Sequence, residues 1–284
     1  MNVAHHIRRS LAHLLGRVSG RHYHEDFIRV YPDGLRFDKR GRALQPTRKT
    51  INNYLNHLKF YRFAAQFVRG QRVTDIGCGS GYGCMLFSEA GAAAVCGADA
   101  SQRAIEFARQ HYAGRADFTV QSITALDEFR DDSFDVTVCS EVLEHIKEYG
   151  MEHRAMAELR RITRHGGLVV AGTPNIELSS DHGFSFDEMQ ALLAAHFDRF
   201  LIFENALVPF GPARRVWDDR VTSKRTGVVV TENINLAETV LPEGTTPELK
   251  QGLEPGRLAF PPHDIDTRLL HNTHSWIVVA RNER

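Results

Sequence analysis

Short apolar runs alternate with longer amphipathic segments through the middle of the chain. Apolar runs of four to eight residues are typical of buried strands, whereas apolar residues spaced three and four apart are typical of helices. The pattern predicts seven strands, at residues 73–76, 94–98, 117–121, 134–139, 168–171, 199–207 and 275–281. It predicts helices between them at residues 83–90, 101–112, 141–149, 151–164 and 186–195. Such alternation favours an α/β fold, with a mostly parallel sheet and helices on both faces.

Two regions depart from this alternation. Residues 1–70 are predicted to form an N-terminal helical cap region, because helical spacing appears at residues 3–18 and again from Thr50 or Asn52 to about Val68. Residues 71–207 and 275–284 then form the α/β domain. Residues 208–274 hold seven of the ten prolines, and their length far exceeds an ordinary connection. We therefore predict an insertion between strands six and seven that serves as a substrate lid.

Composition narrows the class of protein. The chain has 35 Lys and Arg against 35 Asp and Glu, 42% hydrophobic residues, and no apolar run near the ~18 residues of a membrane span. The four cysteines form no Cys-x-x-Cys pair, which indicates free thiols in a reducing compartment and predicts a cytoplasmic protein without a membrane partner. Residues 1–48 carry ten basic against four acidic side chains, but no aromatic-interleaved basic motif accompanies them, so a nucleic-acid partner is not expected.

The first strand breaks into a glycine-rich turn that opens a helix. Glycine tolerates positive φ and lets the backbone approach a ligand closely, while a helix N-terminus offers free N–H groups. The glycine spacing is not that of a dinucleotide site, because Tyr82 or Cys84 stands where the third glycine of Gly-x-Gly-x-x-Gly is needed. An NAD-dependent oxidoreductase is therefore disfavoured.

The turn reads Asp-x-Gly-x-Gly-x-Gly from Asp75 to Gly81, which resembles the first motif of the S-adenosylmethionine-dependent methyltransferases with a Rossmann-like fold. Asp99 ends the second strand, where an acidic side chain can accept both ribose hydroxyls of an adenosine. The resemblance covers residues 72–207 and 275–281. It implies seven strands in the order 3-2-1-4-5-7-6.

The resemblance also implies S-adenosyl-L-methionine as cofactor. Asp75 would lie under its methionine moiety, with Ser140 nearby. The Ser122 hydroxyl and the Ile123 backbone would replace an acidic residue that contacts adenine in other members. The full set of expected cofactor residues is Asp75, Gly77, Gly79, Gly81, Asp99, Ala100, Ser122, Ile123 and Ser140.

The fourth strand is followed by a candidate catalytic cluster. Positions i, i+3 and i+4 share one face of a helix, so Glu141, Glu144 and His145 are predicted to point the same way. The Glu-x-x-Glu-His motif resembles two groups: the ubiquinone-biosynthesis O-methyltransferases and the methyltransferases acting on the 3′-terminal ribose of small RNAs. In the second group these residues, with a later His that corresponds here to His182, hold a divalent metal. Mixed oxygen and nitrogen ligands suit Mg²⁺, Mn²⁺ or Fe²⁺.

Two readings of the cluster need no metal. His145 or His182 can act as a general base on a hydroxyl, near its natural pKa. Alternatively the cluster is structural, because acidic residues favour a helix start and Glu141 with His145 forms an i, i+4 pair.

An activating group is needed for a hydroxyl acceptor more than for a neutral amine, which already carries a lone pair. We therefore predict methyl transfer to a hydroxyl, and we expect a small-molecule acceptor because the sequence has no obvious RNA-binding appendage. The Thr173-Pro174-Asn175 strand end and the helix after it resemble methyltransferases of glycan and sugar natural-product pathways, which implies a sugar or natural-product biosynthesis intermediate as the acceptor. Three alternatives remain: an aminosugar N-methyltransferase, an RNA ribose methyltransferase, and a non-catalytic S-adenosylmethionine-binding module.

Overall fold

The computed structural model describes residues 28–38, 42–176, 182–206, 229–231 and 273–283. The helix predicted at residues 3–18 lies outside the described residues, as does the predicted lid at 208–274 apart from three residues of one strand and the last two of the segment. None of the helices in the described ranges combines the length and the apolar character that crossing a membrane requires.

The centre of the fold is an eight-stranded sheet in the order β5-β4-β3-β6-β7-β10-β8-β9. The first five of these strands along that order run parallel, β10 is antiparallel to both of its neighbours, and β9 is parallel to β8. The seven predicted strands are present in the predicted order, and β9 adds an edge strand that was not predicted. Their bounds are β3 (Arg72–Ile76), β4 (Ala94–Asp99), β5 (Asp117–Val120), β6 (Phe134–Ser140), β7 (Thr163–Pro174), β8 (Arg199–Ala206), β9 (Val229–Thr231) and β10 (Thr273–Arg281).

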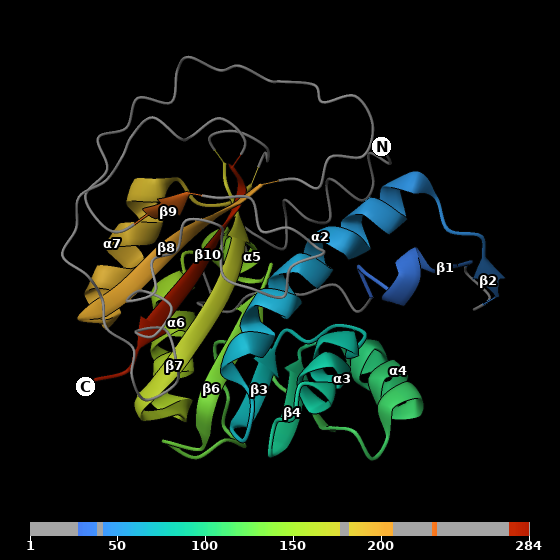
Figure 1. Cartoon of the computed structure of the whole chain (residues 1–284), viewed down its shortest axis with the longest axis horizontal. Coiled ribbons are helices and arrows are strands. Elements are labelled where there is room, and N and C mark those ends of the chain that lie inside the picture. The colour runs from blue at the N-terminus through green and yellow to red at the C-terminus, as the bar shows by residue number, and fades with distance from the viewer. Residues whose placement is uncertain (1–27, 39–41, 177–181, 207–228, 232–272, 284) are drawn as a thin grey trace.

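Helices cover both faces of the sheet, as predicted (Figure 1). On one face α2 (Arg48–Ala64), α3 (Tyr82–Glu89) and α4 (Gln102–Tyr112) pack over a core that includes Phe60, Phe87 and Ile105. On the other face α5 (Leu143–Lys147), α6 (Glu152–Ile162) and α7 (Phe186–His196) pack over a second core around Met156 and Trp276. Smaller elements precede or follow α2: η1 (Pro32–Gly34), β1 (Arg36–Phe37), β2 (Ala43–Leu44) and η2 (Ala65–Phe67).

The first described long helix, α2, begins earlier than predicted. Thr47 is its N-cap, because the Thr47 hydroxyl accepts from the Thr50 N–H while the Thr50 hydroxyl accepts from the Thr47 N–H. This capping box places Thr50 inside the first turn, so neither Thr50 nor Asn52 caps the helix. The helix then carries Phe60, Tyr61 and its other buried aromatic side chains onto the sheet, close to the glycine loop.

The stretch before α2 also contacts the domain. The Ser80 hydroxyl of the glycine loop donates to the Val30 carbonyl at 2.7 Å, and the Tyr31 ring packs edge-on against Phe107 of α4. Residues ahead of the sheet therefore lie against the loop that follows β3. The division of the chain into a cap region, a domain and a lid stays a prediction.

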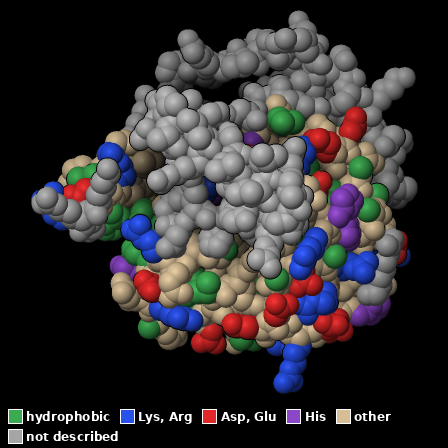
Figure 2. Space-filling view, turned by 180° about the vertical axis from the view of Figure 1, so that it is seen from behind, with side chains coloured by type: hydrophobic (Ala, Val, Ile, Leu, Met, Phe, Trp, Pro, Cys, Tyr) green, Lys and Arg blue, Asp and Glu red, His purple; other side chains and the backbone are tan. Residues whose placement is uncertain are grey.

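The described surface mixes charges of both signs. On the face shown in Figure 2, the acidic and basic side chains outside the grey regions are interspersed, and no broad basic patch is visible there.

Candidate functional site

The glycine loop between β3 and α3 is held by its backbone conformation. Gly77, Gly79 and Gly81 have φ values of +79°, +54° and +84°, a region that other residues rarely adopt. A Cβ on Gly81 would lie 2.7 Å from the Cβ of Ala108, and one on Gly77 would overlap Val142, so both positions are closed by packing. A Cβ on Gly79 would meet no atom of the described residues within 4 Å. Gly77 and Gly81 are thus packed against neighbouring side chains, whereas Gly79 borders space that no described residue fills.

Asp99 joins this loop to the end of β4. One carboxylate oxygen accepts from the Gly79 N–H and the other from the Ser101 N–H, both at 2.8 Å. An acidic side chain in this position, at the end of the second parallel strand and beside a glycine loop, can accept hydrogen bonds from ribose hydroxyls. The sequence prediction placed Asp99 beside the loop, and the structure also gives it a role in holding the loop closed.

Asp75 lies beneath the loop and is fully buried. Burial raises its pKa to about 7, while the Tyr61 hydroxyl, which donates to Oδ2 at 3.1 Å, works against that rise. The other oxygen, Oδ1, has no hydrogen-bond partner among the described residues. A buried polar atom without a partner is uncommon in native structures and points to a ligand that completes it.

The pH dependence of stability should report this burial. An Asp whose pKa is raised in the folded state favours folding most at low pH, and that contribution is lost as pH rises from about 4 to about 7. Asp75→Asn removes this titration. We therefore expect the free energy of unfolding of the variant minus that of wild type to be ~2 kcal/mol more positive at pH 7 than at pH 5. Urea denaturation of the ligand-free protein measures the difference. Asp117→Asn, at an exposed position, is the control, and an equal gain at both pH values would contradict the prediction.

The sequence allows Tyr61, in the helix before the first strand, to face the site but favours core packing, and it does not reveal the hydrogen bond to Asp75. Burial raises the pKa of Tyr61 well above its usual value, so its hydroxyl stays a donor to Asp75. Its ring packs against Tyr82 and Phe87 with centroid distances of 5.3 and 5.6 Å.

Removing the Tyr61 hydroxyl should destabilise the fold. Tyr61→Phe keeps the ring contacts but removes the hydroxyl that donates to the buried Asp75 carboxyl group, at an expected cost of ~1–3 kcal/mol. Thermal unfolding at pH 7.5 measures it. Tyr112→Phe, which removes a half-buried hydroxyl not bonded to Asp75, should change stability less, and equal effects of the two variants would count against the role assigned to Tyr61.

The residues predicted to contact adenine, Ser122 and Ile123, follow the end of β5. The Gln121 N–H donates to the Asp99 carbonyl at 3.0 Å, which brings the segment holding Ser122 and Ile123 beside Asp99 and Ala100. The Ser122 hydroxyl forms a 2.9 Å hydrogen bond with the Thr124 hydroxyl, and the Ile123 side chain is buried in the core. The structure therefore brings these positions together with the glycine loop at one edge of the sheet.

The helix predicted at residues 141–149 is shorter than expected. It begins at Leu143, and Glu141 stands before it with φ of +55° while its N–H donates to the Gly172 carbonyl at 2.8 Å. The prediction that Glu141 shares a helix face with Glu144 and His145 is wrong, because the backbone turns at Glu141 as the pairing of β6 with β7 ends. Burial raises the pKa of Glu141 to about 7.

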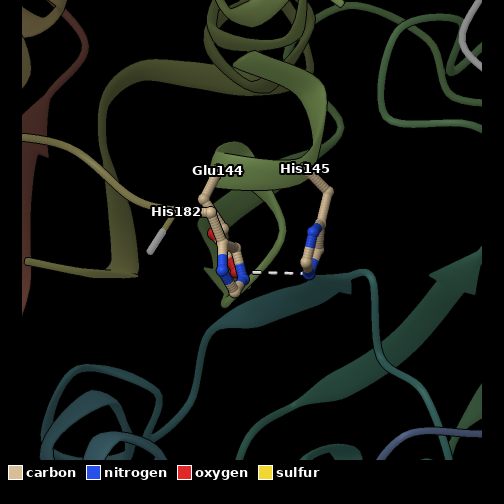
Figure 3. A group of neighbouring side chains, drawn as sticks. All are labelled: Glu144, His145 and His182. Carbon is tan, nitrogen blue, oxygen red and sulfur yellow. Dashed lines mark ion pairs between the residues drawn. The ribbon is translucent and has the colours of Figure 1, made fainter. Parts of the chain in front are cut away.

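Glu144, His145 and His182 do converge (Figure 3). One ligand atom from each lies within 4.8 Å of the others, and the imidazoles of His145 and His182 stack with centroids 5.2 Å apart. Glu144 and His145 come from α5, whereas His182 comes from the segment between β7 and α7. Glu141 lies outside this group.

Glu144 is held rigidly within the group. Its side chain is 1% exposed, the Thr173 hydroxyl donates to Oε2 at 3.1 Å, and His145 Nε2 lies 3.5 Å from Oε1. Burial, reinforced by Glu141, raises the pKa of Glu144 well above its usual value. A cation bound against this carboxylate would offset the desolvation that raises its pKa.

Ser140 lies at the carboxyl end of β6, beside these groups. Its hydroxyl is buried without a hydrogen-bond partner in the described part of the chain. Ser140 and Glu141 line a pocket with Asn53, Asn56 and His57 of α2. The three α2 residues were not predicted as site residues, although their i, i+3, i+4 spacing placed them on one helix face.

Part of the chain is similar to known proteins. Residues 74–171 match a family model described as a methyltransferase domain. A ubiquinone biosynthesis O-methyltransferase of Sinorhizobium medicae is 37% identical over 118 residues, which cover 40% of this chain and 46% of that protein. One from Neisseria meningitidis is 37% identical over 112 residues, covering 38% and 46%. The matched segment thus spans under half the length of these relatives.

Solved structures of methyltransferases are also similar. Magnesium protoporphyrin IX methyltransferase of Synechocystis is 17% identical, with 56% of this chain and 82% of that chain covered and a TM-score of 0.46. An S-adenosylmethionine-dependent methyltransferase from Methanosarcina mazei is 22% identical, with 48% and 84% covered and a TM-score of 0.42. The segment matched by the family model, residues 74–171, contains the glycine loop, Asp99 and the Glu144–His145 pair.

Proposed function

We propose that this chain is an S-adenosylmethionine-dependent methyltransferase that acts on a hydroxyl of a small molecule. The observation that carries the proposal is the position of the glycine loop and Asp99. They lie together at the carboxyl edge of β3 and β4, inside the segment that matches a methyltransferase domain. Ligands of open α/β sheets bind at this edge.

The site fits the proposed cofactor in shape and charge. Gly79 opens onto free space, and the Oδ1 atom of buried Asp75 lacks a partner among the described residues. Burial raises the pKa of Asp75 and of Glu141 to about 7, and a positively charged ligand beside these carboxyl groups would stabilise their ionised forms. The residues that would hold the cofactor are Asp75, Gly77, Gly79, Gly81, Asp99, Ala100, Ser122, Ile123 and Ser140.

When bound, S-adenosylmethionine supplies a methyl group on a positively charged sulfur. The protein's part is to align the acceptor and remove its proton. Glu144, His145 and His182 suit this second task, because they present a carboxylate and two imidazoles within 4.8 Å of one another. Mg²⁺ or another divalent metal held by these three would lower the pKa of the acceptor hydroxyl. Without a metal, His145 or His182 would act as the base.

The relatives favour oxygen as the acceptor atom. Both relatives named above are described as O-methyltransferases, and the segments that match them are about 37% identical. We therefore place hydroxyl methylation ahead of aminosugar N-methylation. The proposed acceptor is a small molecule of sugar or natural-product biosynthesis.

Calorimetric binding of S-adenosylmethionine and S-adenosylhomocysteine to the full chain tests the proposal. We expect both to bind with micromolar or tighter affinity. The same titrations with Mg²⁺, Mn²⁺ or EDTA show whether a metal contributes. Failure of both ligands to bind would overturn the methyltransferase function, and tight binding of NAD in their place would do so as well.

A further inference from the structure

The group formed by Glu144, His145 and His182 joins two segments that are separate in the sequence. Glu144 and His145 project from α5, whereas His182 reaches them from the segment before α7 (Figure 3). The helix holds the first two side chains in a fixed relation to each other. The position of His182 depends instead on what holds its own segment against α5. This position matters, because a displacement of about 1 Å in a reacting group can cost about a hundredfold in rate.

The residues after His182 are anchored on the sheet. The Phe184 N–H donates to the Pro174 carbonyl at 3.0 Å, and the Phe184 carbonyl accepts from the Trp276 indole N–H at 2.9 Å. A Cβ on Gly183 would overlap the Pro174 carbonyl, so only glycine lets the backbone approach β7 this closely. These contacts fix the segment against β7 and β10, but they do not involve α5, which carries the other two members of the group.

Lys147, the last residue of α5, connects this segment to the helix. Its Nζ donates to the Gly183 carbonyl at 2.9 Å and to Glu188 Oε2 at 2.6 Å, and it lies 4.8 Å from the centroid of the Phe184 ring. An ammonium group has three donors, so it can bond both oxygens at once. Glu188 is itself fixed, because its Oε2 also accepts from the Ser185 N–H at 2.8 Å in the capping box of α7.

The Lys147 contacts lie beside both imidazoles of the group. Lys147 stands two positions after His145 on α5, and Gly183 directly follows His182. The two imidazoles stack with centroids 5.2 Å apart, and His145 Nε2 lies 3.5 Å from the Glu144 carboxylate. One ammonium therefore ties together the two backbone segments that carry these rings.

The contacts of Lys147 contribute more to placement than to stability. The Lys147 and Glu188 side chains are 25% and 47% exposed, and an ion pair with this much access to water stabilises a fold only slightly. The buried Phe184 ring and the Trp276 hydrogen bond would still anchor the segment on the sheet without Lys147. Loss of the ammonium would thus release the Gly183 carbonyl from α5 while the fold remains.

We propose that Lys147 is a positioning residue, which holds the Gly183 carbonyl and thereby sets the His182 imidazole against His145 and Glu144. This rests on the proposed function, since the same group is proposed to activate the methyl acceptor. The placement matters whether the group holds a divalent metal or His182 serves as a base, because a ligand and a base both act only at the correct distance.

Nuclear Overhauser effects (NOEs) between histidine ring protons test this placement in the full chain, with EDTA present and no cofactor added. The protein carries ¹³C-labelled histidine, and His145→Gln and His182→Gln assign the two rings. Lys147→Met keeps the apolar stem and removes the ammonium, whereas Lys147→Arg keeps a cationic donor. The matched control is Lys49→Met, the same change at an exposed position of α2.

We expect an NOE between the His145 and His182 rings in wild type. It should be lost in Lys147→Met, retained in Lys147→Arg and unchanged in Lys49→Met. The Trp276 indole resonance, which reports the anchor on Phe184, should keep its wild-type position in all of them.

An NOE of wild-type intensity in Lys147→Met would overturn the proposal, as would its absence from wild type or its equal loss in Lys147→Arg. A displaced Trp276 resonance in Lys147→Met would also overturn it, because Lys147 would then support the fold as a whole. The measurement needs no cofactor. Failure of S-adenosylmethionine to bind would therefore count against the proposed function alone and leave the placement of His182 by Lys147 to be judged by the NOE.

Discussion

Replacing Asp99 with alanine is expected to weaken binding of S-adenosylhomocysteine by a hundredfold to ten-thousandfold. The carboxylate closes the glycine loop by accepting from the Gly79 and Ser101 N–H groups at 2.8 Å, and it lies at the end of β4, where an acidic side chain can bind the two ribose hydroxyls. Hydrogen bonds to a charged group contribute ~1.5–3 kcal/mol each, and two of them account for that range. Isothermal titration calorimetry on the purified variant measures the change.

The control for this prediction is Asp117→Ala. Asp117 is exposed and begins β5, at the edge of the sheet opposite to the end of β4 where Asp99 stands. It should bind the ligand as wild type does. If Asp99→Ala unfolds at a lower temperature yet keeps its affinity, Asp99 serves only to cap the loop and the helix after it.

Replacing His145 with glutamine is expected to slow methyl transfer to a hydroxyl acceptor by a hundredfold to ten-thousandfold, with the affinity for S-adenosylhomocysteine unchanged. His145 Nε2 lies 3.5 Å from the buried Glu144 carboxylate and its ring stacks on His182. Loss of a positioned general base costs this much, and loss of a metal ligand has an effect of similar size. Transfer of a tritiated methyl group at saturating cofactor measures the rate.

Chelation separates the two explanations for the role of His145. If a metal activates the hydroxyl, EDTA abolishes wild-type activity, Mn²⁺ or Mg²⁺ restores it, and Glu144→Gln responds to neither. If His145 is a base, EDTA has no effect. His153→Gln is the control, because His153 contacts His196 between α6 and α7 instead of the site. Full activity in His145→Gln would exclude both roles.

Several features of the fold followed from local sequence alone. Apolar runs predicted the seven strands, because a strand buried on both faces of a parallel sheet is made of consecutive apolar residues. The helices between them were predicted from apolar residues spaced three and four apart. The helix boundaries were less accurate. The helix predicted at residues 151–164 ends at Ile162, since Thr163 already pairs with Phe134 of β6 and its hydroxyl donates to Thr137 at 2.6 Å. This strand pairing joins residues far apart in the sequence, and the spacing of apolar residues within one helix cannot predict it.

The glycine loop and the position of Asp99 were also predicted from the sequence. Alternate glycines after a strand demand positive φ, and the structure shows it at Gly77, Gly79 and Gly81. Asp99 lies beside them because parallel strands end at the same edge of the sheet. Such features depend on one or two neighbouring strands, so residue type and spacing are sufficient to predict them.

Tertiary packing decided the rest of the site. The Tyr61 hydroxyl reaches Asp75 only because α2 crosses the sheet beside the glycine loop, and the polar pocket exists only because the same helix faces the ends of β6 and β10. Glu141 left the helix face predicted for it because its N–H pairs with Gly172 of β7. The sequence by itself determined the strands, the loop and the residue types available for chemistry. Contacts between distant segments decided which of those residues meet and which are buried. The free energy of these contacts comes from packing and desolvation, and they leave no local periodic pattern in the sequence.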